Sequence, residues 1–125
     1  PNINAALGCA QLEQLPSFLA AKQKIQQRYQ QAFADNAELE MVVQPPNCQS
    51  NYWLPALKLP EDFSVSIDDC LKQLTEQGIG ARPVWDLMHQ LPMYKDCPRM
   101  DLTTAENLSK RLLCLPSGVS LGVDQ

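Results

Sequence analysis

Residues 1–34 constrain the fold more than any other feature, because their apolar side chains recur at helical spacing. Pro16 interrupts this pattern, and a proline inside a helix loses a backbone hydrogen bond and clashes with the preceding turn. The sequence therefore predicts two helices, over about residues 4–15 and 17–34, with a kink or break near Leu15. The apolar stripe of the second helix consists of Phe18, Ala21, Ile25, Tyr29 and Phe33.

Three later segments have the composition of β-strands. Residues 39–43 and 52–59 are rich in strand-forming types, and residues 79–85 give a third candidate. Pro55 favours an edge position for the second strand, because proline donates no ladder hydrogen bond. A helix between the second and third strands would allow one parallel pair, with the other pairing antiparallel.

Two further helices are expected among these strands. Ser66, three residues before Asp69, is a capping signature for a helix over about 67–77 that stops at Gly78. A last helix is expected over about 104–113. This order predicts an α+β fold, in which long N-terminal helices cover a small sheet of about three strands. Such a sheet cannot hide the apolar surface of the first helices, so we expect them to pack against something else as well.

Length and charge restrict the classes of function. The chain has 125 residues, enough for one domain, and its net charge of −4 argues against nucleic-acid binding. No apolar run approaches the roughly 20 residues that span a bilayer, so no membrane partner is expected. The five cysteines are an odd, well-separated set without a CxxC pair, which favours a reduced, cytoplasmic protein with buried thiols and no metal site.

No self-contained catalytic motif is visible. Instead, Arg82, Trp85, His89 and Tyr94 lie within 13 residues, and His89 is the only histidine. A guanidinium binds phosphate or carboxylate, aromatic rings stack, and an imidazole bonds hydroxyls, so the cluster suits an anionic or sugar-like ligand. A packed loop with Arg82 in a surface ion pair explains the same residues, and the composition leaves both interpretations open.

Four ordered segments resemble one known family. Residues 1–13 (PNINAALGCAQLE) resemble the N-x-x-A-A-L-G-x-x-Q-L helix of the DegT/DnrJ/EryC1/StrS sugar aminotransferases. SNYWL at 50–54, GIGARPVW at 78–85 with His89 and LPMY at 91–94, and the closing helix and turn at 105–118 resemble further family segments in register. The sequences of the SNYWL and RPVW motifs are most similar to those of the LegC-like branch, which aminates UDP-linked 4-keto-6-deoxy-hexosamines on the route to legionaminic-type sialic acid analogues.

The resemblance implies a fold-type-I enzyme that uses pyridoxal phosphate (PLP). Such enzymes move an amino group, usually from glutamate, to a keto-sugar nucleotide, in polysaccharide or nonulosonic-acid biosynthesis, and they work as homodimers. It implies that residues 1–125 are the small C-terminal domain and that the large PLP-binding domain, with its Schiff-base lysine and glycine-rich turn, precedes them. This part alone is expected to be inactive, without bound PLP and without catalytic residues of its own.

The resemblance also gives Arg82, Trp85, His89 and Tyr94 candidate roles as substrate-binding residues. Arg82 would hold a nucleotide phosphate or the carboxylate of glutamate, Trp85 and Tyr94 would pack on the sugar, and His89 would hydrogen-bond it. The alternative is a free-standing α+β domain that binds a small ligand or a protein through this loop, without catalysis. The Schiff-base lysine and the glycine-rich turn discriminate between the aminotransferase and the free-standing domain, because both must lie upstream if the chain is part of an aminotransferase.

Overall fold

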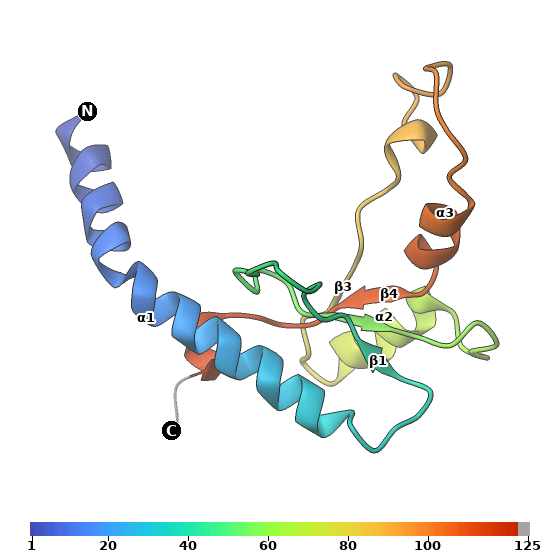
Figure 1. Cartoon of the computed structure of the whole chain (residues 1–125), viewed down its shortest axis with the longest axis horizontal. Helices are drawn as coiled ribbons and strands as arrows, with labels where there is room; N and C mark the ends of the chain where they lie inside the picture. Colours follow the sequence, from blue (N-terminus) through green and yellow to red (C-terminus); the bar gives the residue numbers. More distant parts are fainter. Residues whose placement is uncertain (123–125) are drawn as a thin grey trace.

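One continuous helix, α1 (Asn2–Ala32), forms the N-terminal region in the computed structural model, which describes residues 1–122. Pro16 lies inside α1, and the helix axis changes direction in its N-terminal half (Figure 1). The bend agrees with the predicted kink, whereas the prediction of two separate helices is wrong. A single proline bends a helix without ending it when the turns on both sides stay intact.

Four short strands form one sheet in the order β1-β2-β4-β3, and all neighbouring strands are antiparallel. The strands are β1 (Glu40–Met41), β2 (Ala56–Lys58), β3 (Arg82–Pro83) and β4 (Leu112–Cys114). The α+β class is confirmed, but the sheet has one strand more than expected, and the possible parallel pair does not occur among the strands of residues 1–122.

The additional strand, β4, corrects the predicted end of the last helix. That helix, α3 (Thr103–Ser109), stops before residues 112–114, which pair with β2 on one side and β3 on the other. A central strand gains hydrogen bonds from two neighbours that are distant in sequence, so its local helical pattern is overridden.

The middle helix, α2 (Ile67–Glu76), follows its sequence signals closely. The backbone N–H of Asp69 donates to Ser66 Oγ at 3.1 Å, which is the predicted cap. Gly78 has a φ of 78°, a left-handed conformation that glycine adopts without steric cost, and the chain turns there toward β3. The predicted boundaries of this helix are confirmed to within one residue.

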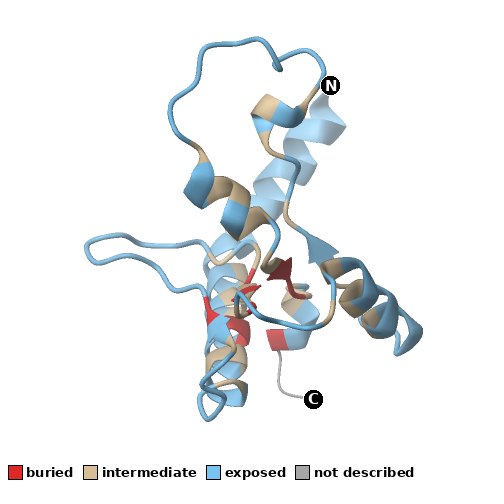
Figure 2. Cartoon of the chain, turned by 90° about the vertical axis from the view of Figure 1, so that its right-hand side faces the viewer, coloured by how far each residue is buried: buried red, intermediate tan, exposed pale blue. Residues whose placement is uncertain are grey.

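The hydrophobic core lies on one face of the sheet. Met41 pairs with Leu57, and Leu57 pairs with Leu113, so these buried side chains form a row across β1, β2 and β4. Leu59 and Leu115 complete the buried cluster. The C-terminal half of α1 and the helix α2 pack against it through Tyr29, Phe33, Ile67, Cys70, Leu71 and Leu74. Figure 2 shows buried residues in the strands and on α1, and Gly122 near the C-terminal end is also buried.

Two segments extend away from the core. Every residue from 1 to 17, in the N-terminal half of α1, is exposed. The segment between β3 and α3, residues 84–102, forms an arm that rises from the sheet and contains the short 3₁₀ helix η1 (Met88–Gln90) (Figure 1). No helix within residues 1–122 is long and apolar enough to cross a membrane.

Candidate functional site

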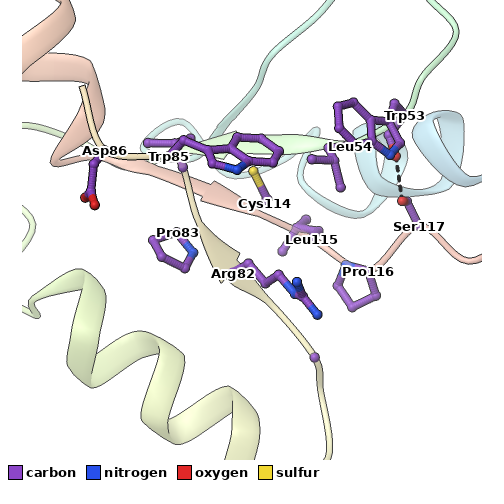
Figure 3. Close-up of a pocket in the computed structure, with 12 residues that line it drawn as sticks. Trp53, Leu54, Arg82, Pro83, Trp85, Asp86, Cys114, Leu115, Pro116 and Ser117 are labelled. Carbon is purple, nitrogen blue, oxygen red and sulfur yellow. Dashed lines mark hydrogen bonds between the residues drawn. The ribbon is translucent and has the colours of Figure 1, made fainter. Parts of the chain in front are cut away.

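A cavity of about 530 Å³ lies where three segments meet beside β3 and β4. Figure 3 shows the loop before β2, the segment that begins in β3 and the segment that leaves β4 around it. Its lining residues include Trp53, Leu54, Arg82, Pro83, Trp85, Asp86, Cys114, Leu115, Pro116 and Ser117. We call this space the aromatic cavity, because both tryptophans of the chain line it.

Strand pairing explains why Arg82 and Cys114 share this cavity. The two residues are direct partners in the β3–β4 ladder, so their side chains lie on the same face of the sheet. Leu113 lies one residue away and belongs to the core on the opposite face. Arg82 is exposed and Cys114 is buried, and burial raises the pKa of the Cys114 thiol. The thiol therefore stays protonated and contributes a small apolar surface to the cavity.

Trp53 and Trp85 form an aromatic pair at the mouth of the cavity. Their ring centroids are 5.7 Å apart and their planes are tilted by 36°. The two residues are 62% and 67% exposed, respectively, which leaves large apolar rings in contact with water. Exposed aromatic rings beside an exposed guanidinium suit a ligand that combines a flat or ring-shaped part with an anionic group.

Trp53 was not among the predicted site residues, although it lies within the SNYWL segment and is one of only two tryptophans in the chain. Its backbone is fixed by polar contacts on both sides. The N–H of Trp53 donates to Asn51 Oδ1 at 3.0 Å, and its carbonyl oxygen accepts from Ser117 Oγ at 2.7 Å and from Lys22 Nζ at 3.1 Å. No local pattern predicts the contacts of Lys22 and Ser117 with Trp53, because they join residues 31 and 64 positions apart in sequence.

The structure divides the four predicted residues between two cavities. Arg82 and Trp85 line the aromatic cavity, whereas His89 and Tyr94 line a second cavity of about 320 Å³ between the arm and α3. His89 Nε2 is 2.8 Å from Glu106 Oε1, and the His89 side chain is only 13% exposed. This contact ties the arm to α3, and it occupies one of the two imidazole nitrogens. The four residues therefore do not form one cluster within this chain.

The comparisons with known proteins agree with the resemblance of the sequence motifs. The sequence profile of the DegT/DnrJ/EryC1/StrS aminotransferase family matches residues 1–125. The chain belongs to this family. GDP-perosamine synthase of Caulobacter vibrioides is 34% identical in an alignment of 124 positions that covers 96% of this chain and 33% of that protein. The dTDP-4-amino-4,6-dideoxy-D-glucose transaminase of Shigella dysenteriae is 28% identical in an alignment of 127 positions that covers 98% of this chain and 34% of that protein.

Solved structures of sugar aminotransferases have the same fold. Helicobacter pylori PseC, an aminotransferase involved in the biosynthesis of pseudoaminic acid, superposes with a TM-score of 0.85 at 22% identity, over 95% of this chain and 31% of that one. DesI, solved in the presence of its TDP-sugar product, gives a TM-score of 0.83 at 22% identity, over 93% of this chain and 30% of that one. The chain spans about a third of the length of the relatives that it matches.

The aromatic cavity of this member of the DegT/DnrJ/EryC1/StrS family does not fit PLP. The chemistry of the cofactor requires a lysine that forms a Schiff base, and no lysine lines the cavity. Lys22 lies nearby, but its amino group donates to Trp53 O and to Ser117 Oγ and is held by those contacts. Within residues 1–122, no group of three or more histidine, cysteine or acidic residues is placed to hold a metal ion. The residues of this chain that line the cavity do not supply the lysine that PLP requires.

Proposed function

We propose that this chain is the C-terminal part of an enzyme that uses PLP to transfer an amino group from glutamate to a keto-sugar nucleotide. The observation that carries the proposal is the family match over the whole chain, together with relatives named for nucleotide-sugar products. PLP would supply the chemistry of amino transfer, and it would be held by residues outside this chain. The remainder of the polypeptide supplies the lysine and the phosphate donors, so residues 1–125 alone are inactive.

The exposed half of α1 supports a second part of the proposal, namely that a larger domain covers it. Ile3, Leu7 and Leu12 are 77%, 62% and 67% exposed, respectively, and several large apolar side chains exposed within one segment are typical of an interface. The relatives are about three times as long as this chain, which provides a partner of sufficient size within the same polypeptide. The whole protein is a cytoplasmic homodimer in this proposal, as the family resemblance implies.

Within this enzyme, the aromatic cavity takes part in binding the sugar nucleotide. Arg82 holds a phosphate of the nucleotide, because a guanidinium is a fork of donors that matches phosphate oxygens. Trp85 and Trp53 pack against the sugar or the base. Tyr94 and His89 contact the substrate from the arm, in a position that the larger domain or a second subunit completes. The acceptor is a UDP-linked 4-keto-6-deoxy-hexosamine, as the SNYWL and RPVW segments suggest.

The proposal is tested with the intact polypeptide, glutamate and 4-keto-6-deoxy sugars linked to UDP, GDP or dTDP. We expect amino transfer with the UDP-linked sugar to be most efficient. Arg82→Ala should raise the KM for the sugar nucleotide about tenfold or more, because it removes a charge-assisted contact with phosphate. Lys72→Ala, at an exposed position of α2, is the matched control and should leave KM unchanged.

Two results would count against parts of this proposal. An unchanged KM in Arg82→Ala would remove this residue from the binding site, while leaving the reaction in place. A lack of amino transfer to all three sugar nucleotides would contradict the function itself.

A further inference from the structure

Lys22 connects three parts of the molecule that are far apart in sequence. It lies on α1, and its Nζ donates to Trp53 O at 3.1 Å, to Ser117 Oγ at 2.9 Å and to Ser117 O. Ser117 Oγ in turn donates to Trp53 O at 2.7 Å. An ammonium group has three N–H donors, and here each has an oxygen acceptor. The group therefore joins the loop before β2 to the segment after β4.

The contacts of Lys22 differ from those of a surface ion pair. All three acceptors are neutral oxygens, and the side chain is partly buried between α1 and the two segments. Burial lowers the pKa of Lys22, since the charged form loses part of its hydration. A long flexible side chain also loses rotamer freedom when it is held in this way. An apolar residue at position 22 would avoid both the loss of hydration and the loss of rotamer freedom. The feature that only a hydrogen-bond donor such as lysine supplies here is therefore the set of contacts with Trp53 and Ser117.

The contacts act on one wall of the aromatic cavity. The other polar contact of Trp53, from its N–H to Asn51 Oδ1, lies within the same loop and does not attach the loop to the rest of the molecule. Pro55 lies two residues after Trp53, and its carbonyl oxygen accepts a hydrogen bond from the N–H of Leu115 at 2.8 Å. The β2–β4 ladder begins at this point. Lys22 and Ser117 thus attach the loop at the residue whose indole faces Trp85.

We propose that Lys22, together with Ser117, is a positioning residue that sets the place of Trp53 in the aromatic cavity. The inference rests on the proposed function for the ligand, which is the nucleotide part of the sugar nucleotide. Lys22 does not contact that ligand. Lys22 affects binding through the Trp53 carbonyl oxygen, which accepts hydrogen bonds from both Lys22 and Ser117.

The test uses the intact polypeptide labelled with fluorotryptophan and observed by fluorine NMR. The signals of the two cavity tryptophans are assigned with Trp53→Phe and Trp85→Phe. Lys22→Met removes the donors and keeps an apolar stem, Lys22→Arg restores donors, and Lys72→Met removes an exposed lysine as the control. Binding of UDP, GDP and dTDP is measured on the same samples.

We expect the Trp53 signal to shift or broaden in Lys22→Met and to return toward the wild-type signal in Lys22→Arg, while Lys72→Met leaves it unchanged. The dissociation constant of the preferred nucleoside diphosphate should rise about tenfold in Lys22→Met, because Trp53 is no longer held in the place where it packs against the ligand. KM for the sugar nucleotide should rise with it and kcat should change less.

An unmoved Trp53 signal in Lys22→Met would overturn the proposal. If Lys22→Met does not fold, Ser117→Ala performs the same test, because it removes the hydroxyl that donates to Trp53 O. If the Trp53 signal responds to Lys22→Met but no nucleoside diphosphate binds the wild-type protein, the positioning of Trp53 is supported and the proposed ligand is wrong. These outcomes distinguish a failure of the Trp53 positioning proposal from a failure of the proposed ligand.

Discussion

The two halves of α1 carry large apolar side chains in opposite surroundings. In the C-terminal half, Ile25 is 3% exposed, and Tyr29 and Phe33 pack against the core of the sheet. In the N-terminal half, Leu7 and Leu12 are more than 60% exposed. The described part of this chain packs against the apolar side chains of only the C-terminal half.

An exposed apolar segment has a particular meaning in a chain that spans about a third of the length of its relatives. Single exposed leucines are ordinary on a protein surface, but Ile3, Leu7 and Leu12 are all exposed within one short segment. We therefore interpret the N-terminal half of α1 as an interface with the remainder of the polypeptide. The following predictions test whether the two halves are equivalent in the whole protein.

The largest effect is expected from leucine truncations in the intact polypeptide. Leu57→Ala should lower the free energy of unfolding by about 2–5 kcal/mol, because Leu57 is buried at the centre of the core. Leu7→Ala should cost about 2 kcal/mol or more if a larger domain covers it. Chemical denaturation of both variants measures the two values.

A small decrease in the free energy of unfolding for Leu7→Ala would contradict the interpretation of this segment as an interface. An exposed leucine that stays in water contributes little, so a change within about 0.5 kcal/mol would show that nothing covers this face. Leu57→Ala is the internal standard, because its burial does not depend on any other part of the protein.

A smaller effect is expected where the C-terminal segment packs against α1. A Cβ at Gly122, at the end of the 3₁₀ helix η2 (Val119–Gly122), would overlap the backbone of Ala21. Gly122→Ala should therefore cost about 1–3 kcal/mol, as overpacking usually does. Gly118→Ala is the control, since its Cβ would meet only Ser120 Oγ at 3.7 Å. Equal stability of the two variants would show that η2 does not pack closely on the C-terminal half of α1.

The smallest effect is a difference in thiol reactivity that leaves stability unchanged. Burial raises the pKa of Cys114, whereas Cys48 and Cys97 are exposed. At about pH 8, iodoacetamide should modify Cys48 and Cys97 before Cys114, because the thiolate is the reactive form. As pH rises, Cys114 should become reactive later than a free thiol, since its ionisation requires a higher pH. Peptide mass spectrometry follows each site, and equally early labelling of Cys114 would contradict its burial beside the aromatic cavity.

Some elements of this molecule were predictable because their signals are local. The cap at Ser66 and the glycine at 78 bracket α2, and both lie within a few residues of the helix that they limit. The family was predictable because four motifs occur in order along the chain. The bend at Pro16 follows from the chemistry of one residue.

Other features depended on contacts that the sequence does not display. β4 is a strand because β2 and β3 pair with it, and the paired residues lie 30 to 58 positions away in sequence. The aromatic cavity is assembled from residues 53–54, 80, 82–86 and 114–117, so its Trp53 wall and the Lys22 contacts were missed. His89 and Tyr94 are close to Arg82 in sequence, but the arm carries them to a different cavity.

The most direct test of the central claim compares the intact polypeptide of the natural reading frame with the 125-residue chain, each supplied with PLP, glutamate and a UDP-linked 4-keto-6-deoxy-hexosamine. We predict that the intact polypeptide is several times heavier than 14.0 kDa and forms the amino sugar, and that the 125-residue chain does not. A natural polypeptide that matches these residues with an added methionine, or amino transfer by the short chain itself, would contradict the account. The first of these results would favour a free-standing binding domain.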